Sequence, residues 1–136
     1  QKEILRDILE IHKQYQVKTF AFDRFLAYNG IIQGLQEEGI ESFEFGQGFL
    51  SMSNPTKELS IMTLGGKIAH GGNPVLRWHM GNIEIKMDEA DNIKIDKRKS
   101  REKVDGAVAL VMALGVWKAF DEGGDSVYES RGIITL

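Results

Sequence analysis

The chain of 136 residues contains no cysteine and only 2 prolines. The absence of cysteine excludes a disulfide framework, a thiolate zinc site and a cysteine nucleophile, and it fits a reducing compartment. Few prolines and no low-complexity stretch favour a folded chain. The longest apolar run, Ala107 to Leu114, is much shorter than the roughly 20 residues that span a bilayer. With 42% hydrophobic residues, the chain has enough apolar side chains for the core of one domain.

Several enzyme signatures are also missing. The segment from Gly65 to Ile68 lacks the upstream glycine and the Ser or Thr of a phosphate-binding loop. No Gly-x-Ser-x-Gly nucleophile elbow occurs. The three histidines, His12, His70 and His79, show no metal-ligand spacing, so we expect them to be structural or exposed.

The net charge of −3 is unevenly distributed. Between residues 94 and 103, six basic residues outnumber two acids, which gives this segment +4 and leaves −7 for the rest of the chain. The basic residues are Lys94, Lys97, Arg98, Lys99, Arg101 and Lys103. A basic patch on an acidic domain indicates contact with a polyanion. A solvated basic loop is the alternative that charge alone leaves open.

Hydrophobic periodicity predicts alternating helices and strands. In chain order these are a helix over 2–14, a strand over 17–22, a helix over 25–38 closed by Gly39, a short strand over 41–45, a helix from Asn54-Pro55 to Leu64, a short strand over 67–70, a helix over 75–81, a hairpin of strands 83–87 and 92–96, and a helix over 102–120. This order is that of an α/β sheet domain. Residues 1–122 are expected to be ordered, and residues 123–136 to form a flexible tail.

The first and last predicted helices each have an unusual feature. The first helix starts at Gln1 without a cap, so we expect a fragment of a longer chain or a processed product. The last helix is apolar nearly all round between Val104 and Val116, so we expect it to be deeply buried.

Asp23 directly follows the strand that contains Phe20-Ala21-Phe22. The carboxyl ends of strands in open α/β sheets are where ligands bind, so Asp23 is a candidate metal ligand. Aspartate is also a favoured N-cap, and capping of the next helix explains this residue equally simply.

Asp105 lies near the start of the long apolar helix. Burying a lone carboxylate costs roughly several kcal/mol unless it is paired or bound to a cation. Favourable interaction with the helix dipole and a salt bridge to Lys103 or Arg101 are the structural alternatives. Gly106 costs about 1 kcal/mol relative to alanine inside a helix, which indicates that another group approaches closely there. Asp105 is therefore the residue that we most expect to be functional.

Carboxylates on separate elements can bind Mg²⁺ or Mn²⁺, which prefer oxygen ligands. A two-metal site holds its ions about 4 Å apart and clamps the attacking and leaving oxygens of a phosphodiester. Such a site usually takes at least three acids, and the sequence offers Asp23 and Asp105 as the clearest two. Asp96 and Glu102 are weaker candidates that we expect to be surface charges.

Four segments in order resemble the nuclease domain of tailed-phage terminase large subunits. They are Val17 to Arg24, Glu44 to Ser53, His70 to Trp78, and Lys97 to Leu114 with its Lys103-Val104-Asp105-Gly106 core. The likeness covers roughly residues 5–118. Each segment alone is weak evidence for this resemblance, but four segments in the same order and at the same spacing are specific to the family.

The resemblance implies a ribonuclease-H-like mixed sheet flanked by helices, and a domain that cuts concatemeric phage DNA with Mg²⁺ or Mn²⁺. Asp23 and Asp105 match two of the family's catalytic, metal-binding acids. The resemblance also implies an ATPase domain upstream, a small terminase subunit and a portal as partners, and a location in the cytoplasm of the bacterial host. Phosphates of double-stranded DNA would meet the basic residues Lys97, Arg98, Lys99, Arg101 and Lys103 without sequence being read.

The family's first acid lies on a strand that would precede residue 1. We therefore expect a partial nuclease domain that lacks its first strands and is inactive by itself. The strand over 17–22 would then expose an unpaired edge, through which the chain could self-associate. Two alternatives remain: a non-catalytic nucleic-acid or protein-binding module that keeps the fold, and a structural α/β domain.

Overall fold

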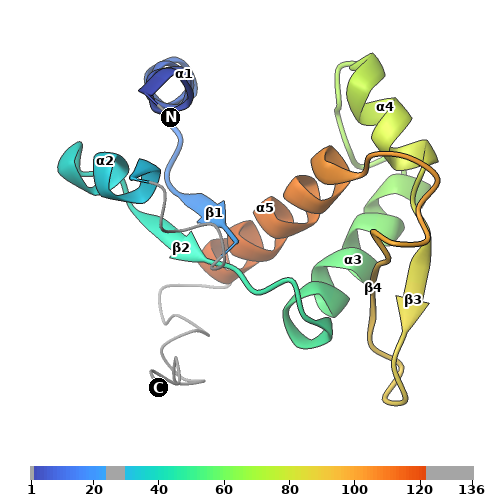
Figure 1. Ribbon diagram of the computed structural model, residues 1–136. Coiled ribbons are helices and arrows are strands. Elements are labelled where there is room, and N and C mark those ends of the chain that lie inside the picture. Colours follow the sequence, from blue (N-terminus) through green and yellow to red (C-terminus); the bar gives the residue numbers. More distant parts are fainter. Residues whose placement is uncertain (1, 24–29, 122–136) are drawn as a thin grey trace. The chain divides into compact units, whose positions relative to one another are not determined.

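The computed structural model describes residues 2–23 and 30–121, which form two compact units, Gln1–Gln47 and Gly48–Leu136 (Figure 1). The beginning of the helix expected over 25–38 and the tail expected from residue 123 lie outside the described residues. Among the described helices, none has the length and apolar character needed to cross a bilayer.

The first unit is a small βαβ arrangement with a helix beside it. Its elements are α1 (Lys2–Tyr15), β1 (Phe20–Phe22), α2 (Ile31–Glu37) and β2 (Ser42–Glu44). β1 and β2 run parallel, with Phe20 opposite Ser42 and Phe22 opposite Glu44. Parallel strands need a crossover connection, and α2 lies within it. Within the described residues, β1 and β2 pair only with each other, so each strand keeps an outer edge without a neighbouring strand.

The apolar side of α1 faces α2 through a close approach at Gly34. A Cβ atom at Gly34 would overlap Cδ2 of Leu5, so glycine lets the two helices approach each other. No residue of α1 is fully buried, and Ile4 is 53% exposed. The predicted helix over 2–14 is confirmed, but its apolar stripe is covered only in part.

The end of α2 is set by Gly39, as the sequence predicts. Gly39 has a φ of +72°, a conformation that glycine adopts without the steric penalty of a side chain. Its N–H donates to the carbonyl of Gln36 at 3.0 Å, and the N–H of Ile40 donates to that of Leu35 at 2.9 Å. This is the Schellman pattern, and the accompanying contact comes from the buried side chains of Leu35 and Ile40.

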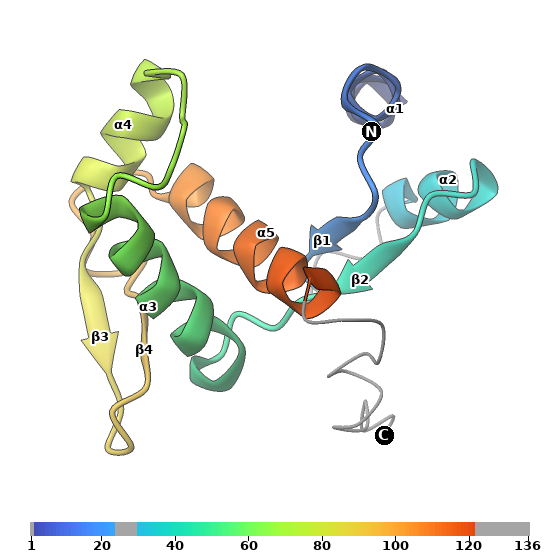
Figure 2. The ribbon, with the colours of Figure 1, turned by 180° about the vertical axis from the view of Figure 1, so that it is seen from behind.

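The second unit contains three helices and a hairpin. Its elements are α3 (Phe49–Leu64), α4 (Pro74–Gly81), β3 (Ile85–Met87), β4 (Ile93–Ile95) and α5 (Asp105–Asp121). α5 packs against both α3 and α4, and β4 lies along α3 (Figures 1 and 2). Buried apolar residues of α3, β4, α5 and the residue before α5 form the core of this unit. They are Met52, Leu59, Ile95, Val104, Ala107, Val108, Val111, Met112, Leu114 and Val116.

The burial expected all round α5 is wrong for one side of the helix. Asp105, Ala109, Ala113 and Trp117 recur every four residues and are all exposed, Trp117 to 52%. Residues four apart share one face of a helix, so α5 has a buried side toward α3 and α4 and an exposed stripe that starts at Asp105. Composition could not reveal this, because the exposed stripe is itself largely apolar.

The start predicted for α3 is wrong by five residues. The helix begins at Phe49, after Gly48 in extended conformation, and Pro55 lies inside it. Proline cannot donate to the carbonyl four residues back and clashes with it, at a cost of about 3 kcal/mol. The buried ring of Pro55 offsets part of this cost. The Asn54-Pro55 pair is typical of a helix start, but packing keeps it in the helix interior.

The strand predicted over 67–70 is also wrong. α3 ends at Leu64, and Gly66, with a φ of +63°, turns the chain away. Residues 67–70 follow without regular structure, because no described strand pairs with them. The next helix is confirmed: the side chain of Asn73 accepts a hydrogen bond from the N–H of Leu76 at 3.0 Å, and Pro74 occupies the first turn of α4.

The predicted hairpin is present and antiparallel, with Lys86 opposite Lys94. Its turn is built by Asp88, whose carboxylate accepts hydrogen bonds from the N–H groups of Ala90 and Asn92. Asp91 adopts a φ of +58°, which Asp tolerates better than most residues. The class predicted from the sequence, α/β, is confirmed: the described residues hold five helices and two small two-stranded sheets.

Candidate metal and nucleic-acid site

Asp23 directly follows β1 and is half-buried. The end of β1 is fixed by a hydrogen bond of 2.8 Å from the N–H of Phe45 to the carbonyl of Phe22. Asp23 thus lies at the carboxyl end of a strand in a parallel pair, where the sequence places it. Residues 24–29, which follow Asp23, lie outside the described ranges, so the capping alternative stays a prediction.

Asp105 is the first residue of α5, and its side chain is exposed. The expected burial of this carboxylate is therefore wrong, because the first turn of α5 starts on the exposed stripe. In the part of the chain that the structure describes, no ion pair joins Asp105 to Lys103 or Arg101. The salt-bridge alternative thus finds no support. The other alternative, a favourable interaction with the helix dipole, is supported by the position of Asp105 at the helix N-terminus.

Gly106, the next residue, is approached by a side chain of another helix. Its N–H donates to Nδ1 of His79 at 2.9 Å, and a Cβ atom at this position would overlap that nitrogen. The close approach inferred from Gly106 is therefore confirmed. The approaching group, His79 of α4, was expected to be structural or exposed, and no spacing in the sequence connects it with residue 106.

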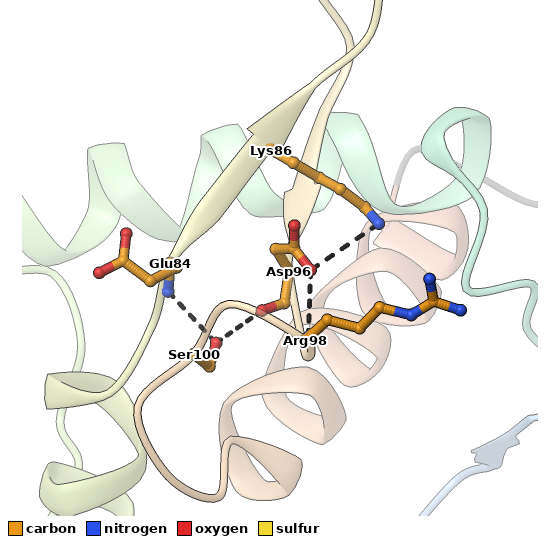
Figure 3. Close-up of polar contacts among 5 residues, drawn as sticks. All are labelled: Glu84, Lys86, Asp96, Arg98 and Ser100. Atoms are coloured by element: carbon orange, nitrogen blue, oxygen red, sulfur yellow. Dashed lines mark hydrogen bonds and ion pairs between the residues drawn. The ribbon is translucent and has the colours of Figure 1, made fainter.

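Asp96 is buried, with 5% of its surface exposed, so its expected role as a surface charge is wrong. Figure 3 shows its carboxylate accepting from the N–H of Arg98 at 3.1 Å and facing Lys86 Nζ at 3.9 Å. Its backbone carbonyl accepts from the N–H and the hydroxyl of Ser100, at 3.0 and 2.8 Å. Asp96 therefore anchors the start of the basic segment to the hairpin.

The environment of Asp96 favours its charged form. Burial acts to raise the pKa of the Asp96 carboxyl, but the N–H of Arg98, the charge of Lys86 and the nearby Lys99 outweigh burial and lower the pKa below 3.8. Asp96 is thus an ionised structural group, with carboxylate Oδ1 engaged by the N–H of Arg98 and by Lys86.

The basic loop, residues 97–103, connects β4 to α5. Its basic side chains are exposed: Lys97, Arg98, Lys99, Arg101 and Lys103. Both ends of the loop are held. Asp96 fixes the start, and near the end the side chain of Asn82 donates to the carbonyl of Lys103 at 3.1 Å. Glu102 is exposed, in agreement with its expected role as a surface charge.

Two further lysines extend this positive region onto the hairpin. Lys86 and Lys94 face each other across β3 and β4, and their ammonium groups lie 5.9 and 5.0 Å from the centre of the Phe49 ring. Burial lowers the pKa of Lys94, and the charges of Lys86 and Lys97 add to this effect against that of Asp96. Lys94 belongs to the basic segment in the sequence, whereas Lys86 lies outside that segment and comes beside Lys94 only through strand pairing.

Within residues 2–23 and 30–121, no three or more His, Cys, Asp or Glu side chains gather where they could hold a metal ion. Asp23 belongs to the first unit and Asp105 to the second. Carboxylate oxygens are nevertheless the donors that Mg²⁺ and Mn²⁺ prefer, and the chemistry of both residues fits such ions.

Known proteins resemble this chain over most of its length. A family model described as "Terminase large subunit, endonuclease domain" matches residues 1–122. The "Terminase, large subunit" of Enterobacteria phage HK97 is 33% identical over 128 residues, which cover 90% of this chain and 25% of that protein. "Protein YmfN" of Escherichia coli (strain K12) is 33% identical over 138 residues, covering 98% of this chain and 30% of that protein.

A solved structure agrees with these relatives. The crystal structure of the HK97 bacteriophage large terminase matches with a TM-score of 0.74 and 33% identity, covering 83% of this chain and 24% of that one. The chain thus spans about a quarter to a third of the length of these relatives. Family model, relatives and structure agree, and the chain belongs to the family of terminase large subunit endonuclease domains.

Proposed function

We propose that this chain is a metal-dependent endonuclease domain that cuts concatemeric double-stranded DNA for packaging into a phage head. Besides family membership, one observation in the structure supports this proposal. In the second unit, an exposed basic loop leads directly into an exposed carboxylate, Asp105, at the head of α5. A nuclease needs this combination: cations for the DNA backbone and an acid for the metal that acts on it.

Asp23 and Asp105 would hold Mg²⁺ or Mn²⁺, and a two-metal site would draw further acids from elsewhere in the protein. The metal, when bound, would activate water and stabilise charge on the phosphodiester. Asp105 suits this role because its carboxylate is exposed and unpaired by the neighbouring cations. Asp96 does not, since it is buried and one of its carboxylate oxygens already faces Lys86 and the N–H of Arg98. The likeness to the HK97 protein supports a ribonuclease-H-like fold for the domain.

Metal binding tests the first part of this proposal. Mn²⁺ titration of the full-length protein, followed by calorimetry, should show binding that Asp105→Ala and Asp23→Ala each weaken at least tenfold. Glu89→Ala, which removes an exposed acid from the hairpin turn, is the matched control and should bind as the parent does. Unchanged binding in Asp105→Ala would remove this residue from the metal site.

The basic loop would bind the DNA backbone through Lys97, Arg98, Lys99, Arg101 and Lys103. Phosphate contacts release counter-ions, so the affinity falls with salt by a slope of about −0.9 for each contact in B-DNA. Replacing the five side chains with glutamine should flatten this slope and weaken binding equally for DNA of any sequence. Replacing the exposed Lys2, Lys13 and Lys18 of the first unit serves as control. A slope that stays the same after the loop is neutralised would exclude the loop from the DNA contact.

The alternative is a module that binds nucleic acid or protein and keeps the fold without cutting. Cleavage assays of the full-length protein with a supercoiled plasmid and Mn²⁺ separate the two. Linear product that disappears in Asp105→Ala favours the nuclease, whereas DNA binding without product favours the module. We further propose, from the family, that the domain works with a packaging ATPase domain, a small terminase subunit and a portal.

A further inference from the structure

The first turn of α5 is capped by a side chain that comes from α4. Helix N-termini carry backbone N–H groups without partners inside the helix. The residue before α5 is Val104, whose side chain has no oxygen with which to accept a hydrogen bond. The N–H of Gly106 instead donates to Nδ1 of His79 at 2.9 Å, from a residue 27 positions earlier in the sequence.

Nδ1 of His79 is the acceptor of this hydrogen bond, so this ring nitrogen faces the N–H of Gly106. The ring lies beside that of Trp78, with centroids 5.2 Å apart. α4 itself is begun by the Asn73 cap and packs against α5, so His79 is held by a regular element.

Glycine at position 106 completes the arrangement. The Cβ atom of any larger residue would overlap Nδ1 of His79. The hydrogen bond between Gly106 and His79 therefore needs glycine at this position. Asp105 lies immediately before this glycine, and its backbone is continuous with the bonded N–H. The direction of the Asp105 side chain therefore depends on the turn that His79 holds.

We propose that His79 is a positioning residue, which fixes the first turn of α5 and thereby aims the Asp105 carboxylate. The inference rests on the proposed function in one respect, since it takes Asp105 as a metal ligand. Groups that orient a metal ligand affect metal affinity or activity by about 10–100-fold when they are lost. His79 acts through Gly106 and Asp105 and is not itself assigned to metal or DNA.

Two variants of similar shape test this role in the full-length protein. His79→Asn keeps an acceptor oxygen near the position of Nδ1, whereas His79→Leu has the same branching and no acceptor. We expect His79→Leu to weaken Mn²⁺ binding about 10–100-fold and to lower kcat for plasmid cleavage, with the KM for DNA unchanged. His79→Asn should restore most of both. The amide signal of Gly106 in a ¹⁵N-correlated NMR spectrum should shift in His79→Leu and return toward the parent in His79→Asn.

The outcomes separate this inference from the proposed function. Equal Mn²⁺ affinity and kcat in His79→Leu and the parent would overturn the positioning role, as would equal losses in His79→Leu and His79→Asn. If Asp105→Ala binds Mn²⁺ as the parent does, the proposed function fails instead. The Gly106 amide signal then still reports whether the hydrogen bond exists. Dispersed amide signals in both variants show that the fold is intact.

Discussion

At the scale of single residues, Asp96 shows how a buried carboxylate organises a loop that is otherwise exposed. One of its carboxylate oxygens accepts from the N–H of Arg98 and faces Lys86, and its backbone carbonyl accepts from Ser100 (Figure 3). The loop begins in a defined turn because each of these groups is satisfied within the protein. The position of the phosphate-binding side chains thus depends on a residue that touches no DNA in our proposal.

Asp96→Asn keeps a side-chain oxygen for the N–H of Arg98 but removes the charge that faces Lys86. We expect a lower free energy of unfolding at pH 7. The folded-state pKa of Asp96 lies below its ordinary 3.8, so its contribution is complete above that pH and is lost as the pH falls through the folded-state value. Urea unfolding from pH 7 to pH 2 should show parent and variant converging below about pH 3.8.

The exposed Glu102→Gln is the control for this experiment and should unfold as the parent does at pH 7. A constant difference between parent and Asp96→Asn at every pH would mean that the charge of Asp96 does not contribute.

Gly106→Ala provides a second prediction at this scale. The new methyl group gains up to about 1 kcal/mol of helix propensity. Its overlap with the His79 ring costs about 1–3 kcal/mol, as overpacking of a filled site usually does. We therefore expect net destabilisation, measured by thermal unfolding. Gly81→Ala has nothing within 4 Å of its new methyl group and should be neutral or stabilising. Equal stability of the two variants would contradict the close approach of His79.

At the scale of elements, a buried hydroxyl of α3 binds the hairpin, in addition to the hydrogen bond from Lys57 Nζ of α3 to the carbonyl of Asp91. The N–H of Ile93 donates to Oγ of Ser53 at 3.2 Å, and Ser53 is only 2% exposed. Ser53→Ala would leave the N–H of Ile93 without a partner, which costs about 1–3 kcal/mol. Denaturant unfolding should show this loss, together with faster amide exchange in β4. Ser60→Ala, on the exposed side of the same helix, should change the stability little.

Local chemistry explains which elements the sequence could predict. The ends of α2 and α3 follow from Gly39 and Gly66, and the start of α4 follows from Asn73, because each signal lies within a few residues of its effect. The start of α3 could not be predicted in this way. The Asn54-Pro55 signal is local, but the burial of Pro55 comes from residues distant in the sequence.

The candidate site shows the same division. The sequence identified Asp23, Asp105 and the basic loop through residue type and order. It did not predict that Asp96 is buried, because the groups that surround this carboxylate include Lys86 from another strand. It pointed to Gly106 as a site of close approach, but it could not name His79 as the approaching group.

At the scale of the whole molecule, positive charge gathers in the basic loop of the second unit, while the chain as a whole is acidic. The two proposed metal ligands are divided, with Asp23 in the first unit and Asp105 in the second. A ligand that binds only the folded state stabilises it by about 2.7 kcal/mol when present at 100 times its Kd. An ion held by Asp23 would therefore stabilise the first unit, and an ion held by Asp105 the second.

Hydrogen exchange of the full-length protein with and without Mn²⁺ tests this expectation. Mn²⁺ should slow amide exchange in β1 and β2 as well as in the first turn of α5. Asp105→Ala should abolish the slowing in the first turn of α5, and Asp23→Ala should abolish it in β1, because each variant loses its own ligand. Slowing that is absent from one unit would remove the aspartate of that unit from the metal site.

The pair of lysines opposed across the hairpin has a consequence for ionic strength. Like charges placed opposite each other on neighbouring strands weaken the pairing, and the Phe49 ring and the buried carboxylate of Asp96 compensate for this in part. Dissolved salt screens that repulsion, just as it competes with DNA for the basic loop. Rising ionic strength should therefore stabilise the hairpin while it weakens DNA binding. Tight DNA binding is favoured at low salt, and a rigid hairpin is favoured at high salt.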